Sequence, residues 1–518
     1  MDRGQEPISG TPTPLPAPAT RRLLGRIELP QVYPALMVVL ICLGTGIRLR
    51  AYLFNRSLWL DEASLALNIV NRSISTLFLE PLGWGQAAPP GFLVAQKFAV
   101  QAFGSSEYAL RLVPFLSGVL SLLLFAYLAK RWLSPTGALV AVGLFALSDS
   151  LIYYSTEAKQ YSSDVTVALL LCCLTVYYES RPYSIFRLVL LGTGGAIAVF
   201  FSHSAVFVLP GLALYLTVPR LIHKDWGEMR RLCLVFLFWA ASFATCYLIF
   251  LRNQAANPIL LTYWSDSFWP VPPHSVWNLL WPVESFLRLF DDPASLRFPG
   301  LIALLCIVGG ASILTKKREV LFILLLPILL ALVASGLHRY PFRGRLMLFV
   351  VPAILWLVSE GAGALIDSVK DKRTVISLAV IGLLFFYPLL QASVYLVKPR
   401  TQEEIKPVMG YLRDHWQKED RLYLYYQSLV PFQYYADRYG FSDSDYTIAA
   451  AYKLDWNQYE ADLAKLRGRG RLWILVSHVT VRKGMDEEEF LLNYLDTIGT
   501  RLDAFKAPGA SVYLYDLR

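Results

Sequence analysis

Two adjacent acidic residues, Asp61 and Glu62, follow the first apolar segment of the chain and are the first candidates for chemistry. They stand beside Trp59, an aromatic residue of the type that is enriched where a chain leaves a membrane. One of two such carboxylates can act as a general base, and adjacent acids can also hold a divalent cation. The pair is equally typical of a helix start, where Asp61 would cap the backbone and Glu62 would complement the helix dipole.

A second group of ionisable residues lies between two apolar runs, in residues 153–164. Charged side chains at a membrane boundary are costly and usually face a cavity. We therefore predict that this segment faces a cavity, with Glu157 as a candidate for chemistry and Lys159 and Tyr161 as candidates for substrate binding. The alternative is a solvated loop with a local ion pair between Glu157 and Lys159.

A third group, residues 338–345, carries three arginines at the boundary of an apolar run. Arginine forks match the oxygens of a phosphate bidentately, so this segment is suited to a lipid phosphate. The alternatives are contact with lipid headgroups and pairing with Glu157 or Asp61. The predicted substrate-binding residues here are Arg339, Tyr340, Arg343 and Arg345.

His203 is a further candidate for substrate binding, although a histidine at a tight turn is more often a structural hydrogen bonder. No metal ligands are predicted. All six cysteines lie in apolar runs, where they act as small apolar residues, so we expect neither a disulfide nor a cysteine-bound metal. No cofactor is assigned, and a divalent metal at the acidic pair stays an open alternative.

The elements that must position these residues are membrane spans. Of the 518 residues, 55% are hydrophobic and 17% are charged, which is too apolar for an ordinary soluble enzyme. Apolar runs of about 17 to 25 residues, the length that a bilayer core requires, recur about eleven times before residue 398. The net charge of +9 comes from basic residues in short loops between these runs, so we predict a membrane lipid partner and no nucleic acid.

The distribution of basic residues predicts the orientation of the chain. Arg21, Arg22 and Arg26 precede the first run, which puts the N-terminus in the cytoplasm and all the candidate residues on the external side. Residues 89–103 are too short to span and carry a polar stripe, so they are predicted to form an interfacial helix. Residues 188–218 make two spans only if the chain turns at 202–204.

Three regions follow from this reading. Residues 1–30 are predicted to be a disordered cytoplasmic tail, 31–397 a transmembrane domain, and 398–518 an external soluble α/β domain. In the last region we expect helices near 403–416 and 487–495, with strands near 421–426, 472–476 and 511–515.

The order of these motifs resembles a known family. The acidic pair, the Arg-Leu-Val-Pro sequence at 111–114, an E-A-R-x-Y-like pattern in 154–161 and the segment 340–345 are together similar to GT-C glycosyltransferases of the protein O-mannosyltransferase and aminoarabinose transferase type. The resemblance covers about residues 31–397. It implies an all-α polytopic bundle with external interfacial helices, in a bacterial inner or plasma membrane, that acts on cell-envelope glycans.

The resemblance also implies roles for individual residues. Asp61 matches the general base on the acceptor hydroxyl, Glu62 supports it, and Glu157 is the second acid on the cavity wall. The resemblance implies that the donor is a polyprenyl-phosphate sugar and that the acceptor is a glycan, a lipid or a protein. It also implies that the transfer inverts the configuration of the anomeric carbon. Arg343 and Arg345 are the first candidates for the phosphate, followed by Lys159 and Arg339. The chain departs from its relatives at Ala88 and Ser64, where they often carry a basic residue.

The competing reading is a transporter or flippase of a lipid-linked or anionic substrate, which would also place acids and arginines in a cavity. A transporter is expected to show broken helices at the midplane and groups reachable from both faces, whereas the charged groups here cluster on one side. A glycan polymerase, a ligase or an assembly subunit without activity would also bind a lipid phosphate, so these three readings stay open as well.

Overall fold

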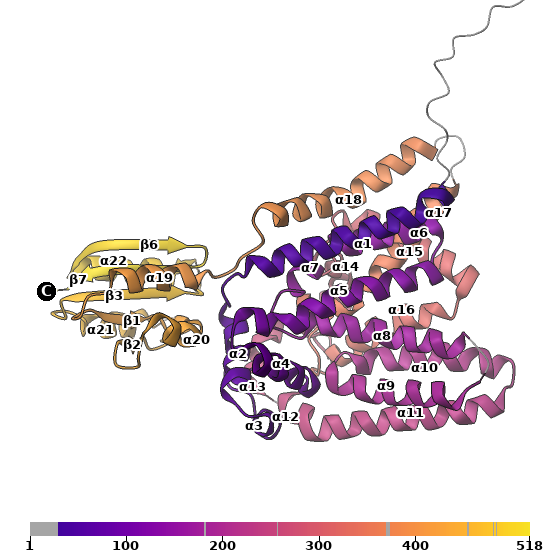
Figure 1. Cartoon of the computed structure of the whole chain (residues 1–518), viewed down its shortest axis with the longest axis horizontal. Helices are drawn as coiled ribbons and strands as arrows, with labels where there is room; N and C mark the ends of the chain where they lie inside the picture. Colours follow the sequence, from indigo (N-terminus) through magenta and orange to yellow (C-terminus); the bar gives the residue numbers. More distant parts are fainter. Residues whose placement is uncertain are drawn as a thin grey trace, which may run out of the picture.

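The computed structural model describes residues 29–180, 183–255, 257–368, 373–452, 455–479, 481–482 and 484–517. The predicted tail lies outside these residues, apart from Leu29 and Pro30, which begin the first helix. Figure 1 shows a bundle of long helices, with a small domain of strands and helices beyond one of its ends. The predicted fold class, a polytopic helical bundle with a small C-terminal α/β domain, is confirmed.

Apolar helices of two lengths make the bundle. Eight helices in the described part of the chain are long and apolar enough to cross a membrane, and three further apolar helices are shorter. The long ones are α1 (Leu29–Phe54), α5 (Glu107–Trp132), α8 (Tyr161–Glu179), α10 (Ala205–Ile222), α11 (Trp226–Cys246) with its π-helical extension η1 (Tyr247–Leu251), α15 (Pro299–Lys317), η3 (Gly344–Val350) continued by α17 (Val351–Ser368), and α18 (Arg373–Val397). The shorter ones are α6 (Pro135–Leu147), α9 (Ile185–Phe201) and α16 (Val320–Gly336). Together they correspond to the predicted spans.

The remaining helices of this part are short and connect the spans. They are α2 (Leu60–Asn71), α3 (Ile74–Leu79), α4 (Pro90–Phe103), α7 (Asp149–Tyr154), α12 (Arg252–Ala255), α13 (Pro258–Tyr263), η2 (Ser265–Ser267) and α14 (Val276–Asp291). Helices α2, α3, α4 and α13 gather at the end of the bundle that faces the small domain (Figure 1). Helix α4 matches the predicted interfacial helix in position and is not among the candidate spans.

The chain turns where the sequence requires it between α9 and α10. The first of these helices ends at Phe201 and the second begins at Ala205, so the long uncharged stretch makes two helices as predicted. The turn lies at the same end of the bundle as α4, because a Cβ added at Gly91 of α4 would meet the ring of Phe201. Ser202 and His203, which follow Phe201, are thereby held near α4.

Helix α17 is buried in the bundle and fixes the position of η3. It packs against α15 so closely that a Cβ on Gly309 would lie 1.9 Å from the carbonyl oxygen of Leu357. Only glycine permits this approach of two helix backbones. Arg345 stands at the start of η3, which continues directly into this closely packed helix.

The C-terminal domain is a three-layer α/β/α sandwich. Its five-stranded sheet has the order β2-β1-β3-β7-β6, with β2, β1 and β3 parallel and β7 antiparallel to both β3 and β6. Successive residues of a strand point to opposite faces. Leu422 and Leu424 therefore pack with one pair of helices, and Tyr423 and Tyr425 with the other.

The elements of this domain include some that were not predicted. The expected ones are α19 (Ile405–His415), β1 (Arg421–Leu424), β3 (Arg471–Ser477), α22 (Glu487–Ile498) and β7 (Ala510–Asp516). The others are α20 (Leu429–Tyr439), β2 (Tyr446–Ile448), α21 (Trp456–Ala464), β4 (Val481–Arg482), β5 (Met485–Asp486) and β6 (Thr500–Ala507). The 3-10 turn η4 (Tyr426–Ser428) joins β1 to α20.

The C-terminal domain is docked on the membrane domain by charged and apolar contacts. Glu107, at the start of α5, accepts from Lys406 at 3.1 Å and from Arg438 at 2.9 Å. The backbone N–H of Leu58 donates to the Tyr435 hydroxyl at 2.9 Å, and one apolar cluster joins α2 and α4 to α19 and α20. The domain thus holds the loop that leads into α2.

Candidate active site

Asp61 lies in the first turn of α2, and its carboxylate forms ion pairs with two basic side chains. Oδ1 accepts from Lys159 Nζ at 2.9 Å, and Oδ2 lies 2.8 Å from Arg345 Nη1. Gln86 Nε2 donates to Oδ1 at 3.1 Å and Gln86 also accepts from Lys159. Burial raises the pKa of Asp61, but Lys159 and Arg345 outweigh it and hold this pKa well below its usual range. The carboxylate is ionised, and the Asp61 side chain as a whole is 17% exposed although its Oδ2 is buried.

The helix-cap interpretation of Asp61 is wrong. The N-cap of α2 is Trp59, and no side chain caps the helix. The Asp61 carboxylate turns away from the helix backbone to residues that are distant in sequence. The alternative of an arginine pairing with Asp61 is the one that Arg345 adopts.

Arg345 is surrounded by aromatic rings. Its guanidinium carbon lies 5.4 Å from the ring centre of Tyr161, 5.6 Å from Trp59 and 5.7 Å from Trp264. Aromatic faces attract a guanidinium while leaving the N–H groups at its edge free to donate in the plane. Arg345 is therefore held in a position where its fork can face an anion other than Asp61.

Glu157 is a buried carboxyl with one unused oxygen. Its Oε1 accepts from Trp59 Nε1 at 2.9 Å, while Oε2 has no hydrogen-bond partner among the described residues. Burial and the nearby Glu62 raise the pKa of Glu157 to about 7, although Arg345 and Arg56 oppose this. A carboxyl that titrates near neutral pH can exchange a proton with a substrate.

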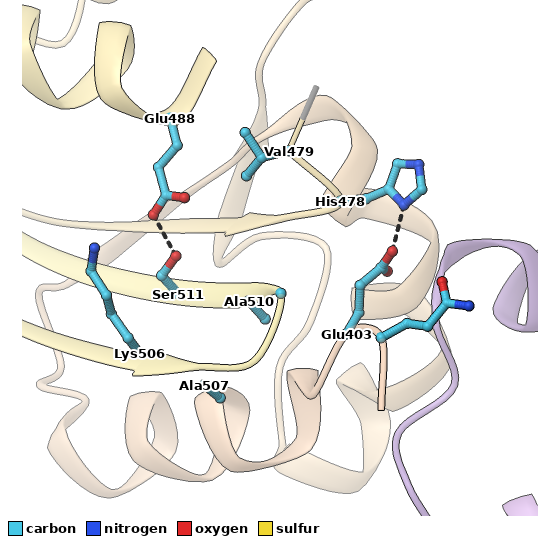
Figure 2. Close-up of a pocket in the computed structure, with 10 residues that line it drawn as sticks. Glu403, His478, Val479, Glu488, Lys506, Ala507, Ala510 and Ser511 are labelled. Atoms are coloured by element: carbon cyan, nitrogen blue, oxygen red, sulfur yellow. Dashed lines mark hydrogen bonds and ion pairs between the residues drawn. The ribbon is translucent and has the colours of Figure 1, made fainter. Parts of the chain in front are cut away.

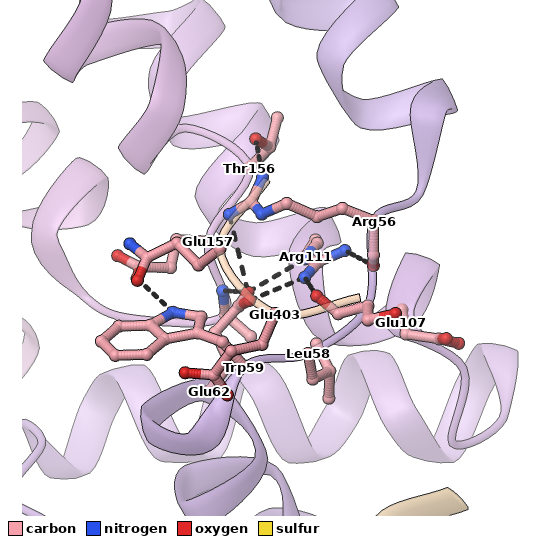
Figure 3. Close-up of polar contacts among 12 residues, drawn as sticks. Arg56, Leu58, Trp59, Glu62, Glu107, Arg111, Thr156, Glu157 and Glu403 are labelled. Atoms are coloured by element: carbon pink, nitrogen blue, oxygen red, sulfur yellow. Dashed lines mark hydrogen bonds and ion pairs between the residues drawn. The ribbon is translucent and has the colours of Figure 1, made fainter. Parts of the chain in front are cut away.

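Glu62 pairs with Arg111 and not with the two cations at Asp61. It is fully buried and makes a bidentate ion pair with Arg111, with contacts of 3.0 and 2.7 Å (Figure 3). It also accepts from the backbone N–H of Ala158 at 2.7 Å, next to Glu157. Glu62 thereby holds the loop that carries Glu157 and Lys159, while its predicted support of Asp61 stays a prediction.

A stability prediction follows from the buried Glu62–Arg111 pair. Glu62→Gln leaves Arg111 buried without its counter-charge, so we expect it to lower the free energy of unfolding by about 3 to 5 kcal/mol. Glu284→Gln is the matched control, because Glu284 is 59% exposed and pairs only with Arg288 one turn away. Its expected cost is at most about 0.5 kcal/mol. Thermal unfolding in detergent measures both, and equal losses would contradict the assigned role.

The remaining predicted substrate-binding residues make no direct polar contact with Asp61 in the described part of the chain. Arg339 and Arg343 are exposed, and among the described residues neither forms a hydrogen bond or ion pair with Asp61. The Tyr340 hydroxyl donates to the carbonyl of Leu346 at 2.7 Å, which fixes the turn that carries Arg345. His203 is partly buried, its Nε2 has no partner among the described residues, and burial lowers its pKa to about 4.

Several contact residues were not predicted from the sequence. Gln86, Trp59 and Trp264 touch the cluster around Asp61, yet only Trp59 stood beside a candidate. A polar residue in a Gly/Pro-rich loop, such as Gln86, is a weak signal. In the described part of the chain, no group of three or more His, Cys, Asp or Glu side chains could hold a metal ion.

The C-terminal domain reaches the site through His478. Its ring stacks on Trp59 at 6.2 Å between centres, and it pairs with Glu403, whose Oε2 accepts from the backbone N–H of Leu60 at 3.0 Å. Figure 2 shows Glu403 and His478 at one side of a cavity and Glu488 and Lys506 at the other. The cavity has a volume of about 490 Å³ and a mixed acidic and basic lining, which suits a polar ligand rich in hydroxyls.

Comparison with known proteins identifies the fold. Residues 87–251 match the family model described as dolichyl-phosphate-mannose-protein mannosyltransferase. No curated protein sequence matches the chain. The match covers α4 to α11 and includes the segment with Glu157 and Lys159.

Solved structures match over nearly the whole chain. ArnT from Cupriavidus metallidurans in the apo state superposes with a TM-score of 0.51 at 14% identity, covering 94% of this chain and 98% of that one. The same enzyme bound to undecaprenyl phosphate gives 0.50 at 14%, covering 93% and 97%. The apo oligosaccharyltransferase of Archaeoglobus fulgidus gives 0.50 at 12%, covering 94% and 74%. The resemblance to the GT-C glycosyltransferases is thus confirmed at the level of the fold.

Proposed function

We propose that this GT-C-fold membrane protein is an inverting glycosyltransferase that moves a monosaccharide from a polyprenyl-phosphate donor to an acceptor hydroxyl. The observation that carries the proposal is the Asp61 carboxylate between Lys159 and Arg345. One carboxylate and two cations are the groups that such a transfer needs, a base for the acceptor and a counter-charge for the leaving phosphate. The family model over 87–251 and the ArnT-like fold support this choice.

Lys159 and Arg345 are the proposed partners of the donor phosphate. ArnT has been solved with undecaprenyl phosphate, which supports a lipid of this class. A phosphate carries more charge than one carboxylate and offers more acceptor oxygens, so it competes with Asp61 for both cations. When the two cations turn to the phosphate, the influence that depresses the pKa of Asp61 weakens. Asp61 becomes a stronger base only when the donor is bound.

The transfer step then involves Asp61 and the acceptor. Asp61 takes the proton of the acceptor hydroxyl, and the oxygen forms a bond to the anomeric carbon from the face opposite the phosphate. The bond between that carbon and the phosphate oxygen breaks, and its electron pair leaves with the polyprenyl phosphate. A single displacement inverts the anomeric carbon. Arg345 and Lys159 stabilise the negative charge that develops on the leaving phosphate.

Glu157 is proposed as the second acid of the site, and its raised pKa predicts a pH dependence of stability. An unfolded glutamate ionises near pH 4.5, whereas folded Glu157 holds its proton up to about pH 7. Its contribution to stability is therefore complete below pH 4.5 and is lost as the pH rises towards 7 and above. Glu157→Gln cannot titrate, so the stability difference between wild type and this variant should shift against the wild type from pH 5 to pH 8. A difference in melting temperature that is constant over this range would contradict the raised pKa.

The side of the membrane completes the proposal. The candidate site and the C-terminal domain lie at one end of the bundle (Figure 1), and the positive-inside distribution supports placing that end outside the cell membrane. The acceptor, a glycan, lipid or protein, would approach past Trp59 from the cavity at the C-terminal domain. Arg339 and Arg343 are proposed to meet lipid phosphates at the exposed rim.

The test uses the full chain purified in detergent and undecaprenyl phosphate that carries a radiolabelled mannose, glucose or pentose. Total membrane extract supplies acceptors. We expect labelled acceptor and bare undecaprenyl phosphate in equal amounts with at least one donor. The absence of product with all three donors, from protein that still binds undecaprenyl phosphate, would contradict the proposal.

A further inference from the structure

Two buried acceptor atoms at the start of α8 have no hydrogen-bond partner among the described residues. They are Gln160 Oε1 and Asp164 Oδ1, on side chains that are 7% and 8% exposed. The backbone N–H of Asp164 donates to the carbonyl of Gln160 at 2.9 Å, so the two residues are one helical turn apart and lie on the same face. Buried polar atoms without partners are rare and call for an explanation.

A third such atom lies on the neighbouring turn. The Asp164 carboxyl lies near the Ser202 hydroxyl, which contacts that of Ser204 at 2.9 Å. His203, between these serines, has a buried Nε2 without a partner in the described part of the chain. Polar atoms from α8 and from the turn between α9 and α10 thus meet in one place, with the unused capacity to bind hydroxyls.

This place adjoins the candidate active site. Gln160 stands between Lys159, which binds Asp61, and Tyr161, whose ring lies against Arg345. The anomeric carbon of a donor must lie between its phosphate and the base, so the rest of the sugar ring must lie beside them. Gln160 Oε1 and Asp164 Oδ1 are unpartnered acceptors beside these contacts, one helical turn apart, in addition to Glu157 Oε2.

We propose that Gln160, Asp164 and His203 form a subsite for the hydroxyl groups of the donor sugar, an inference that rests on the proposed function. Gln160 Oε1 and Asp164 Oδ1 are acceptors, so they cannot hydrogen-bond the acceptor oxygens of a phosphate, and burying them against hydrocarbon would leave them unsatisfied. Sugar hydroxyls can donate to both of them, and a hydroxyl can either donate to His203 Nε2 or accept from it. Because buried acceptors discriminate strongly against ligands that lack the donor, these residues select the sugar.

The test separates recognition of the sugar from recognition of the lipid phosphate. The full chain in detergent is titrated with bare undecaprenyl phosphate and with undecaprenyl phosphate that carries mannose, glucose or a pentose. Asp164→Asn and Gln160→Met keep the size of each side chain. Thr175→Val is the matched control, since Thr175 is buried on the same helix and donates only to Leu171 at 2.9 Å.

We expect the wild type to prefer one sugar-linked lipid over the bare lipid, and each variant to lose about tenfold or more of that preference. The affinity for bare undecaprenyl phosphate should stay within about twofold in both variants and in Thr175→Val. Variants that keep the preference and lose only thermal stability would show that the atoms hold water, and would overturn the proposal. Wild-type protein that binds the bare lipid without preferring any sugar overturns the subsite alone, whereas wild-type protein that binds no polyprenyl lipid overturns the proposed function.

Discussion

Asp61→Asn is expected to lower the rate of sugar transfer by about 10² to 10⁴-fold, because the amide cannot take a proton from the acceptor hydroxyl. The same substitution frees Lys159 and Arg345 from a competing carboxylate at 2.9 and 2.8 Å. Affinity for bare undecaprenyl phosphate should therefore be kept or become tighter. Transfer is measured with labelled donor, and affinity by titration of the same preparation.

Measuring the affinity for undecaprenyl phosphate distinguishes loss of the base from misfolding of the variant. A variant that fails to fold loses both activity and lipid binding, whereas loss of a base removes activity alone. Asp414→Asn is the control, since Asp414 is 59% exposed on the C-terminal domain and pairs only with Arg413. Retention of more than about a tenth of the wild-type rate in Asp61→Asn would move the role of base to another group, with Glu157 the first candidate.

Arg345→Met is expected to lower the rate of sugar transfer by about 10² to 10³-fold. The leaving phosphate loses a preorganised, positively charged hydrogen-bond donor in a partly buried site. Affinity for bare undecaprenyl phosphate should fall by about 10 to 100-fold, in line with the loss of hydrogen bonds to a charged group. Arg345→Lys keeps the charge and loses the fork, so it should lie between wild type and Arg345→Met.

The control for Arg345 is Arg288→Met, which removes an exposed arginine that pairs with Glu284. Its transfer rate and lipid affinity should match the wild type. Equal lipid affinity in Arg345→Met and wild type would place the phosphate elsewhere, with Lys159 the remaining cation at Asp61.

The membrane architecture was predictable because bilayer length and uncharged runs constrain it strongly. The turn at 202–204 followed from the length of one apolar stretch alone, and it was confirmed. In the C-terminal domain, the strands with mostly buried residues were predicted, whereas β2 has three residues and β6 is largely exposed, so neither gave a clear apolar pattern.

The site was only partly predictable because its contacts join distant segments. Pairing of Asp61 with an arginine of residues 338–345 was one alternative, but nothing in the sequence selected Arg345 among the three arginines or indicated Lys159 as the second partner. Helix geometry could have separated the acidic pair, since successive residues point about 100° apart and only one of them can face a cavity. Glu62 is the one that turns inward to Arg111.

The most direct test of the account follows the sugar-phosphate bond of the donor in sealed proteoliposomes that contain labelled undecaprenyl-phosphate sugar and external acceptor. The account predicts that wild-type protein cleaves this bond, giving bare undecaprenyl phosphate and a labelled product of inverted anomeric configuration, and that Asp61→Asn does not. Movement of intact donor between the leaflets without cleavage, at the same rate in wild type and Asp61→Asn, would contradict it and favour a flippase.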